Sequence, residues 1–281
     1  MNPNEEIKRL DKAPKAYDNR EYIHSPQARS LRILAEYQQP NVQFKENGIH
    51  STIIFFGSAR IKSEAQFHVE MEALRIHAEN STGAEQEHAQ LKLNRLARTR
   101  EMCEYYEDTV ELARMLTEWS HTLPKDEQYV IATGGGPGIM EAGNRGAYLA
   151  RGRSVGLNIS LPFEQYPNPY ITPELNFEFH YFFMRKYWFA YMAKALVIFP
   201  GGFGTLDELF EVLTLIQTGK IRKKMPICIY GEKFWKSVMN FDYLADMGMI
   251  EHSDLDLFKF VNSPQEAFDY IKEGLIRIHN H

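Results

Sequence analysis

The chain is poor in cysteine and has no long apolar run, and both absences narrow what it can be. Its two cysteines, Cys103 and Cys228, lie far apart without a C-x-x-C spacing. This excludes a disulfide framework or a cysteine-based zinc site and suits a reduced protein. No apolar run approaches the roughly 18 residues needed to cross a bilayer, and the polar N-terminus shows no secretory signal. We therefore expect a soluble, cytoplasmic protein without a membrane partner.

The chain also lacks an excess of positive charge and any recognisable pattern of metal-ligating histidines. Its formal net charge is −5, so nucleic acid is not expected as a partner. The ten histidines show no H-E-x-x-H or comparable spacing, and we predict no metal and no cofactor. With 44% hydrophobic and 25% charged residues over 281 positions, the chain can bury a sizeable core.

Short apolar runs alternate with helical patterns over most of the chain. The runs lie at 52–60, 129–136, 154–160, 177–183, 195–202, 226–231 and 257–261. Several are apolar almost throughout, as strands covered on both faces must be. Their alternation with helices implies right-handed crossovers. The predicted fold class is therefore α/β, a Rossmann-like doubly wound parallel sheet with helices on both faces.

Two segments depart from this alternation. Residues 1–50 are polar and dotted with proline, which predicts an N-terminal arm with a short helix near 25–38. Residues 51–281 then form a single Rossmann-like domain, with a helical insertion at about 62–121 after the first strand. Within it, apolar side chains from 102 to 119 recur at three-to-four spacing, which predicts one long amphipathic helix.

Glycine follows three of the predicted strands. The junctions read FFGSAR (55–60), ATGGGPGIMEAGNRGA (132–147) and FPGGFGTLDE (199–208). In doubly wound sheets, ligands bind outside the carboxyl ends of the strands, near the point where strand order reverses. Glycine lets the backbone approach a ligand, and the helix that follows offers free N–H groups and the positive end of its dipole. The expected ligand is an anion such as phosphate.

Neither of the familiar phosphate-binding patterns fits these junctions. No G-x-x-x-x-G-K-[ST] is present, which argues against a P-loop triphosphatase. A dinucleotide fingerprint would place G-x-G-x-x-G after the first strand, where the chain offers Gly57-Ser58. The glycines come later and in two separate loops, which predicts a mononucleotide held between them.

The second junction also allows a purely structural interpretation. Gly134 to Gly136 could form a tight turn with Pro137 at the first helical position, where proline costs no hydrogen bond. The small residues in the helix that follows, Ala142, Gly143, Gly146 and Ala147, would permit close packing on the sheet. For this helix the structural and functional interpretations stay open.

The third junction is more specific. Thr205 and Glu208 have the S/T-x-x-E spacing of a capping box, in which Glu208 would bond back to the Thr205 amide. That role does not explain why Pro200, Gly201, Gly202 and Gly204 stand directly before it. Two glycine loops and a positioned carboxylate are better explained by a ligand site.

The glycine junctions and one further motif resemble those of a known family. PGGFGTLDE (200–208) matches the P-G-G-x-G-T-x-x-E motif of the LOG ("Lonely guy") family, and FMRK (183–186) is similar to its M-R-K element. GGGPGIMEA (134–142) resembles the family's second glycine loop, and FFGSAR (55–60) its opening strand end. The resemblance spans about residues 50–230, and the arm and the helical insertion mark a long form.

The resemblance implies a function. Characterised family members, which are often mislabelled lysine decarboxylases, cleave the N-glycosidic bond of AMP or of cytokinin riboside 5′-monophosphates, the latter in cytokinin biosynthesis. It implies an AMP nucleosidase-like phosphoribohydrolase that releases free base and ribose 5-phosphate and forms a homodimer or larger homo-oligomer. The alternative is a non-catalytic carrier of a nucleotide or of molybdenum cofactor. A decarboxylase would need a Schiff-base lysine, for which the loops offer only Lys186.

The resemblance also implies the site residues, with Glu208 and Arg185 as the catalytic pair. A carboxylate beside the anomeric carbon stabilises an oxocarbenium-like state and activates water. The implied nucleotide- and phosphate-binding residues are Gly57, Ser58, Gly134, Gly135, Gly136, Glu141, Met184, Lys186, Pro200, Gly201, Gly202, Gly204 and Thr205. Arg60 could either contact the ligand or be a charged residue on the helix surface, and both alternatives stay open. The identity of the base also stays open.

Overall fold

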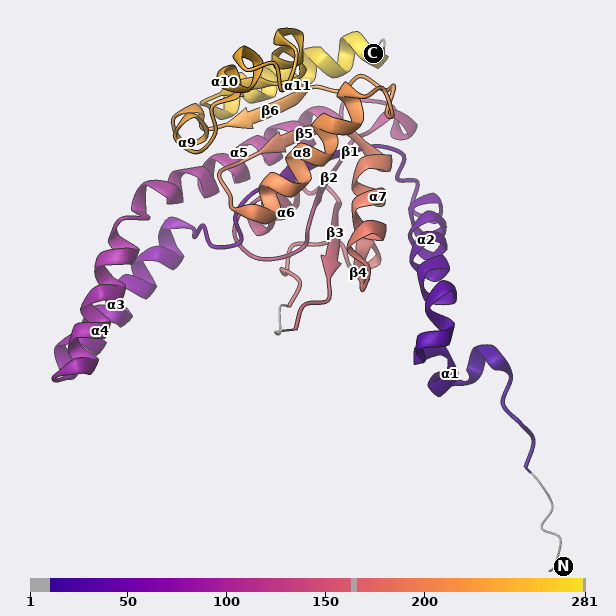
Figure 1. The fold of residues 1–281 in the computed structure, drawn as a ribbon, viewed down its shortest axis with the longest axis horizontal. Coiled ribbons are helices and arrows are strands. Elements are labelled where there is room, and N and C mark those ends of the chain that lie inside the picture. Colours follow the sequence, from indigo (N-terminus) through magenta and orange to yellow (C-terminus); the bar gives the residue numbers. More distant parts are fainter. Residues whose placement is uncertain (1–10, 163–165, 280–281) are drawn as a thin grey trace, which may run out of the picture. The chain divides into compact units, whose positions relative to one another are not determined.

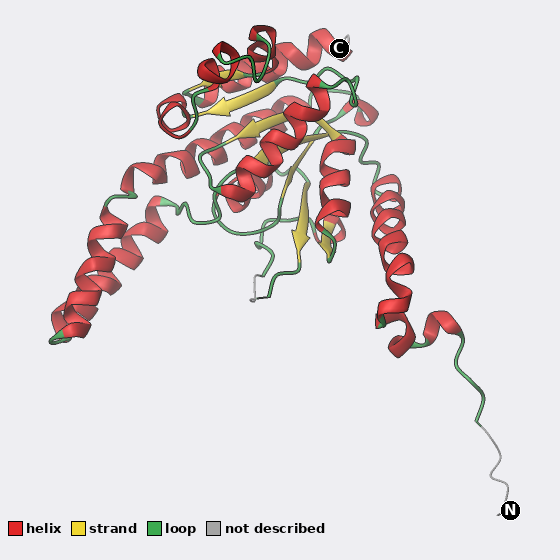
Figure 2. Cartoon of the chain, in the orientation of Figure 1, coloured by secondary structure: helices red, strands yellow, loops and turns green. Residues whose placement is uncertain are grey.

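A seven-stranded parallel sheet forms the centre of the structure, a computed structural model that describes residues 11–162 and 166–279 (Figure 1; Figure 2). The strands are β1 (Thr52–Phe56), β2 (Val130–Thr133), β3 (Ser154–Ile159), β4 (Asn176–Phe179), β5 (Ala193–Ile198), β6 (Ile227–Tyr230) and β7 (Lys259–Val261). Each overlaps one of the seven predicted runs, although β4 begins one residue and β5 two residues before its run, and every neighbouring pair is parallel. The predicted α/β fold class is confirmed.

Helices make up most of the other regular structure of the described residues. They are α1 (Arg20–His24), α2 (Arg29–Glu46), α3 (Glu64–Asn80), α4 (Ala84–Ala97), α5 (Cys103–Ser120), α6 (Ile139–Leu149), α7 (Phe182–Met192), α8 (Phe203–Gln217), α9 (Glu232–Val238), α10 (Phe241–Asp246) and α11 (Pro264–His279). No described helix is both long and apolar enough to cross a membrane.

The strand order β4-β3-β2-β1-β5-β6-β7 reverses at the centre of the sheet. From β1 the chain winds outward through β2 and β3 to β4, returns through α7 to β5 beside β1, and winds outward again on the other side. The switch point therefore lies between the carboxyl ends of β1 and β5. This is where the first and third glycine junctions emerge, and where an open α/β sheet binds its ligand.

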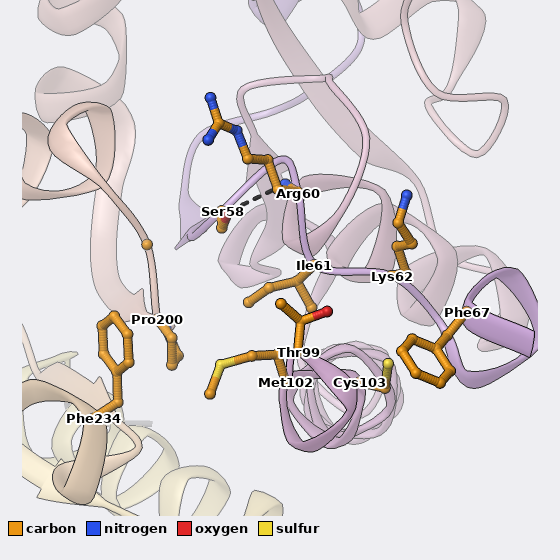
Figure 3. A pocket seen from close by; sticks show the side chains of 11 residues that line it. Ser58, Arg60, Ile61, Lys62, Phe67, Thr99, Met102, Cys103, Pro200 and Phe234 are labelled. Atoms are coloured by element: carbon orange, nitrogen blue, oxygen red, sulfur yellow. Dashed lines mark hydrogen bonds between the residues drawn. The ribbon is translucent and has the colours of Figure 1, made fainter. Parts of the chain in front are cut away.

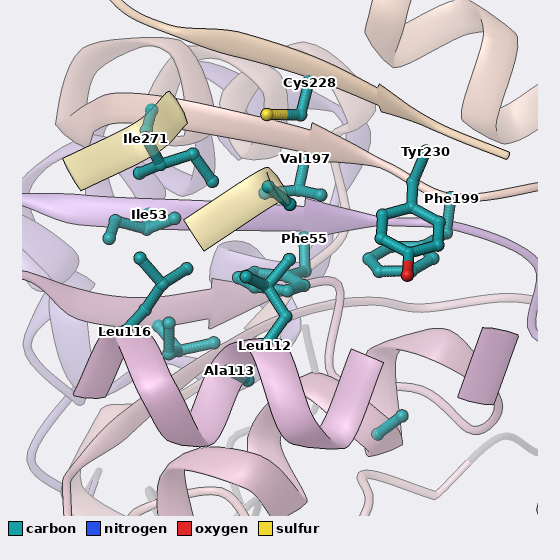
Figure 4. Close-up of a cluster of buried hydrophobic side chains, with 14 of the residues drawn as sticks. Ile53, Phe55, Leu112, Ala113, Leu116, Val197, Phe199, Cys228, Tyr230 and Ile271 are labelled. Carbon is teal, nitrogen blue, oxygen red and sulfur yellow. The ribbon is translucent and has the colours of Figure 1, made fainter. Parts of the chain in front are cut away.

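The core explains why the strands are apolar almost throughout. All five residues of β1 are buried, and Ile53 and Phe55 contribute to a cluster with Leu112 and Leu116 of α5 (Figure 4). Because neighbouring strand residues face opposite sides, Phe56 points the other way and meets the ring of Phe189 of α7, with centroids 4.7 Å apart. Because helices cover both faces of the sheet, the central strands have no face that needs polar side chains.

Three expected elements differ in extent from the observed ones. The arm helix α2 is longer than predicted and continues past Pro40. The predicted helix over 102–119 is α5, but residues 98–102 separate it from α4, a break that the apolar spacing did not indicate. The strand predicted at 177–183 already ends at Phe179, because α7 begins at Phe182.

The chain divides into two compact units, residues 1–42 and 43–281. In the first, the Asn19 side chain accepts a hydrogen bond from the Tyr22 amide and so caps α1. Arg32 of α2 donates to the carbonyls of Ile23 and Ser25, which fixes the turn between the two helices. The first ten residues of the predicted arm lie outside the described residues.

Small residues let α6 pack closely on two sides. A Cβ added at Gly143 would lie 3.1 Å from the Thr133 side chain of the sheet. A Cβ added at Gly146 would lie 2.3 Å from the carbonyl oxygen of Val110 in α5. The close packing expected against the sheet is therefore present, and it extends to the neighbouring helix.

We predict that Gly146→Ala destabilises the protein by about 1–3 kcal/mol, because the added methyl group overpacks a backbone contact. Urea denaturation followed by circular dichroism measures the change. Gly204→Ala is the matched control, since a Cβ there meets nothing within 4 Å and should be neutral or stabilising by about 0.4–1 kcal/mol. Equal stability of the two variants would contradict the packing argument.

Candidate active site

The three glycine junctions meet around one cavity of about 740 Å³. This is within the range of roughly 300–1,000 Å³ that small-molecule sites occupy. The residues that line it are Phe56, Gly57, Ser58, Ala59, Arg60, Gly134, Met140, Ile159, Leu161, Phe182, Arg185, Gly201, Gly202, Phe203, Gly204, Thr205, Leu206, Glu208 and Val238. The cavity thus lies at the switch point, outside the carboxyl ends of β1, β2, β3 and β5.

The backbone of Ser58 ties the three junctions together. Its N–H donates to the Pro200 carbonyl at 3.0 Å, which joins the first junction to the third. Its carbonyl accepts from the Ile139 N–H at 3.1 Å, which joins the first junction to the second. Gly138, at a φ of +71°, permits this approach, because a Cβ there would lie 2.3 Å from the Ser58 oxygen. The position of each loop therefore depends on the other two.

Thr205 and Glu208 do not form the capping box that their spacing allowed. The helix α8 begins two residues earlier, at Phe203 with Gly202 as N-cap, and no described side chain caps it. Thr205 lies inside the first turn and its hydroxyl packs over Gly201, where an added Cβ would be 2.1 Å away. The free N–H groups of this helix end are consequently left for a ligand.

Glu208 forms an ion pair with Arg185 instead of capping the helix. Arg185 Nη2 lies 3.3 Å from Glu208 Oε1, and the two side chains are 14% and 6% exposed. Burial raises the pKa of Glu208 to about 7, and the charge of Arg185 opposes that rise. Burial also lowers the pKa of Arg185, although Glu208 opposes this. The cavity therefore holds a carboxyl group that gains and loses its proton near neutrality.

Arg185 has hydrogen-bonding capacity to spare. Its Nε is buried and has no hydrogen-bond partner among the described residues. Its guanidinium lies over the rings of Phe182 and Phe189, 5.4 and 5.7 Å from their centroids. A Cβ added at Gly134 would lie 2.8 Å from Met140 Sδ and 3.7 Å from Arg185 Nη1, so the second glycine junction lies beside both side chains. A polar ligand in the cavity could use the unpaired donor.

Several predicted site residues do not line this cavity. Gly135, at a φ of +76°, packs against Asn158, and its carbonyl accepts hydrogen bonds from Asn168. Gly136 likewise gives its carbonyl to Asn168. Met184 is a buried core side chain of α7. These residues shape the wall behind the site.

Glu141, Lys186 and Pro200 also have other neighbours. Glu141 accepts hydrogen bonds from Tyr106 at 2.7 Å and Gln66 at 3.3 Å, which connects α6 to α5 and α3. Lys186 pairs with Asp207 at 2.7 Å and with Glu211, one turn further along α8, at 3.0 Å. Its burial works to lower the pKa of Lys186, but these partners outweigh it and raise the pKa. Pro200 contributes its carbonyl to Ser58, as described above.

The apolar part of the cavity wall was not predicted from the sequence. Met140, Ile159, Leu161 and Phe182 lie there, with Phe203 at the start of α8 almost fully exposed. Ile159 was identifiable in principle, since it lies at the end of a predicted strand on the ligand side of the sheet, and Leu161 follows that strand. For Met140 the sequence gave no signal beyond its place in the second glycine junction, and for Phe182 none beyond its place directly before FMRK.

A smaller hollow of about 190 Å³ adjoins the cavity (Figure 3). It shares Ser58, Arg60 and Gly201 with the larger one and is otherwise mostly apolar, with Phe67 and Met102 from the helical insertion. In Figure 3 the Arg60 side chain points away from this apolar group. Among the described residues, no cluster of three or more His, Cys, Asp or Glu could hold a metal ion.

Comparisons with known proteins confirm the resemblance predicted from the motifs. The model of a family described as "Possible lysine decarboxylase" matches residues 140–271, which include Arg185 and Glu208. The chain is 31% identical over 90 residues to the probable cytokinin riboside 5′-monophosphate phosphoribohydrolase LOGL3 of Oryza sativa subsp. japonica. It is 39% identical over 67 residues to the cytokinin riboside 5′-monophosphate phosphoribohydrolase LOG7 of Arabidopsis thaliana.

These matches are partial. They cover 32% and 24% of this chain, and 42% and 30% of the two relatives. Among solved structures, the Moco carrier protein from Chlamydomonas reinhardtii aligns over 81% of this chain and 99% of its own, at 16% identity and a TM-score of 0.43. A TM-score below 0.5 is too low for this likeness to establish a relationship.

The raised pKa of Glu208 is measurable without any substrate. We expect its carboxyl carbon to titrate near pH 7 in a ¹³C NMR experiment, because burial penalises the carboxylate. Arg185→Gln should move this pKa higher still, because the positive charge that favours the ionised form is removed. A titration midpoint of Glu208 near pH 4.5, or a lower pKa of Glu208 in Arg185→Gln, would contradict the described environment.

Proposed function

We propose that this relative of the LOG phosphoribohydrolases hydrolyses the N-glycosidic bond of a nucleoside 5′-monophosphate. The products would be the free base and ribose 5-phosphate. The observation that supports this most is the buried Glu208–Arg185 pair, 3.3 Å apart, in a cavity that also contains an uncapped helix N-terminus. A site that only binds a nucleotide needs the glycine loops but no proton-accepting carboxyl group.

The phosphate would bind at the start of α8. Gly202 and Gly204 line the cavity, and a Cβ at either position would meet nothing within 4 Å, so the space beside them is open. The free N–H groups and the dipole of a 15-residue helix point toward an anion placed there. A phosphate at this end would orient the ribose toward Glu208, and such remote binding contributes several kcal/mol to catalysis.

Binding of a phosphate in the cavity would need one cationic side chain besides Arg185. Among the described residues that line it, the charged ones are Arg60, Arg185 and Glu208. Arg185 already compensates Glu208, whereas a phosphate dianion brings two negative charges of its own. We therefore assign Arg60 to the phosphate end of the substrate, the role that the sequence left open.

The reaction can then be written with all atoms balanced. The bond between C1′ and the base nitrogen breaks, and its electron pair goes to the base. A water oxygen bonds to C1′ and gives a proton to the Glu208 carboxylate. Protonated Glu208 in turn supplies a proton to the departing base. A pKa of about 7 suits a group that must both accept and donate at neutral pH.

The rival functions are less well supported by the site. A decarboxylase would need an unprotonated lysine for a Schiff base, but Lys186 is held by two carboxylates and does not line the cavity. A carrier of nucleotide or molybdenum cofactor is the alternative outcome of the experiments below. A cytoplasmic homo-oligomer and a role in cytokinin biosynthesis stay predictions.

The test of function is release of free base from AMP, CMP, GMP and UMP, followed by chromatography. We expect at least one to be cleaved, and Glu208→Gln to lower kcat by at least about 10²-fold while AMP still binds, because the proton acceptor is lost. Glu211→Gln is the matched control, one turn along α8 and outside the cavity lining. Binding of all four nucleotides without release of any base would favour the carrier.

The rate should depend on pH with a defined sign. Glu208 must be ionised to accept the proton, so kcat/KM rises with pH and levels off above its pKa of about 7. Arg185→Gln should move this acid limb to higher pH, because Arg185 favours the ionised form. If the acid limb of the kcat/KM profile lies near pH 4.5, or does not move in Arg185→Gln, Glu208 is not the proton acceptor.

A further inference from the structure

The segment between β3 and β4 reaches back to the second glycine junction through one side chain. Asn168 is 7% exposed, and its amide nitrogen donates to the carbonyls of Gly135 at 3.0 Å and Gly136 at 3.1 Å. Its backbone N–H donates to the same Gly135 carbonyl at 2.8 Å. Both carbonyls are therefore held on the buried side of the loop by one residue that does not line the cavity.

A buried polar network fixes Asn168 in turn. Its amide nitrogen also lies 2.9 Å from Asn144 Oδ1, and its own side-chain oxygen accepts from the Tyr170 N–H at 3.2 Å. Thr133 donates to Asn144 Oδ1 at 2.7 Å and accepts from the Gly135 N–H at 3.0 Å. Such a network is rigid while every member is satisfied, and costly when one partner is removed.

We propose that Asn168 is a positioning residue of the active site, which sets the place of Arg185 through the glycine loop. The residue directly before the clamped pair is Gly134, which lines the cavity together with Arg185, and a Cβ added to it would lie 3.7 Å from Arg185 Nη1. If the Gly135 and Gly136 carbonyls were released, Gly134 would no longer be held beside Arg185, and the pairing of Arg185 with Glu208 would be disturbed. The effect on turnover rests on the function proposed above, whereas the effect on Arg185 does not.

Asn168→Asp tests this with little change in volume. The substitution removes the amide donor and sets a carboxylate against three oxygen atoms that now accept from Asn168. We expect kcat/KM for AMP to fall by at least about tenfold, since small displacements of catalytic groups cost up to about 10²-fold. Asn168→Ala removes the donor without adding charge and should show the same loss of kcat/KM. It provides the test if Asn168→Asp does not fold.

Ser120→Ala is the matched control for a purely structural effect. Ser120 is also buried and also makes two hydrogen bonds, both to the Tyr129 backbone, but lies at the far end of α5 from the cavity. It should lower the melting temperature and leave kcat/KM unchanged. Folded Asn168 variants with kcat/KM within twofold of the wild type would overturn the proposal.

A second readout separates this inference from the proposed function. The pKa of Glu208, followed by ¹³C NMR without substrate, should rise in Asn168→Ala, because Arg185 moves away from it and the substitution adds no charge. The other charged groups that act on Glu208, namely Lys186, Asp207 and Glu211, lie on α7 and α8 and are the same in this variant. An unshifted pKa contradicts the positioning role even if the wild type cleaves no nucleotide, and a shifted one supports it.

Discussion

The burial of a glutamate against an arginine is the interaction on which the rest of this site depends. Removing two charges from water is costly, and the cost is offset only when the partners are well placed. Arg185 comes from α7, which returns the chain to the centre of the sheet, and Glu208 from α8, which leaves it again. The pair therefore depends on how α7 and α8 are placed before and after β5.

The same topology explains where the cavity lies. Because strand order reverses at β1, the loops after β1 and β5 diverge, and the space between them is not filled by a crossover helix. Ser58 bridges this space with one backbone donor and one backbone acceptor, which join the three glycine junctions to one another. Glycine is needed here because the backbones approach too closely for a Cβ, as at Gly138.

Features encoded by local pattern were predictable, and features made by distant partners were not. The seven apolar runs predicted the place of all seven strands, and the three glycine junctions predicted part of the cavity wall, because both are short patterns within one stretch of chain. A capping box does not form, because α8 starts two residues earlier and Thr205 lies inside its first turn. Glu141 and Asn168 were beyond sequence reasoning, since their partners are 35 and 33 residues away along the chain.

The central claim is that a phosphate at the start of α8 places the sugar beside Glu208. A crystal structure of Glu208→Gln grown with AMP tests this most directly, because the substitution blocks turnover but keeps the shape of the site. We expect the phosphate on the N–H groups of residues 203–205, and C1′ within reach of the position-208 side chain through one water, which requires contacts of about 2.6–3.2 Å. A phosphate bound elsewhere, or a ribose turned away from α8, would contradict it.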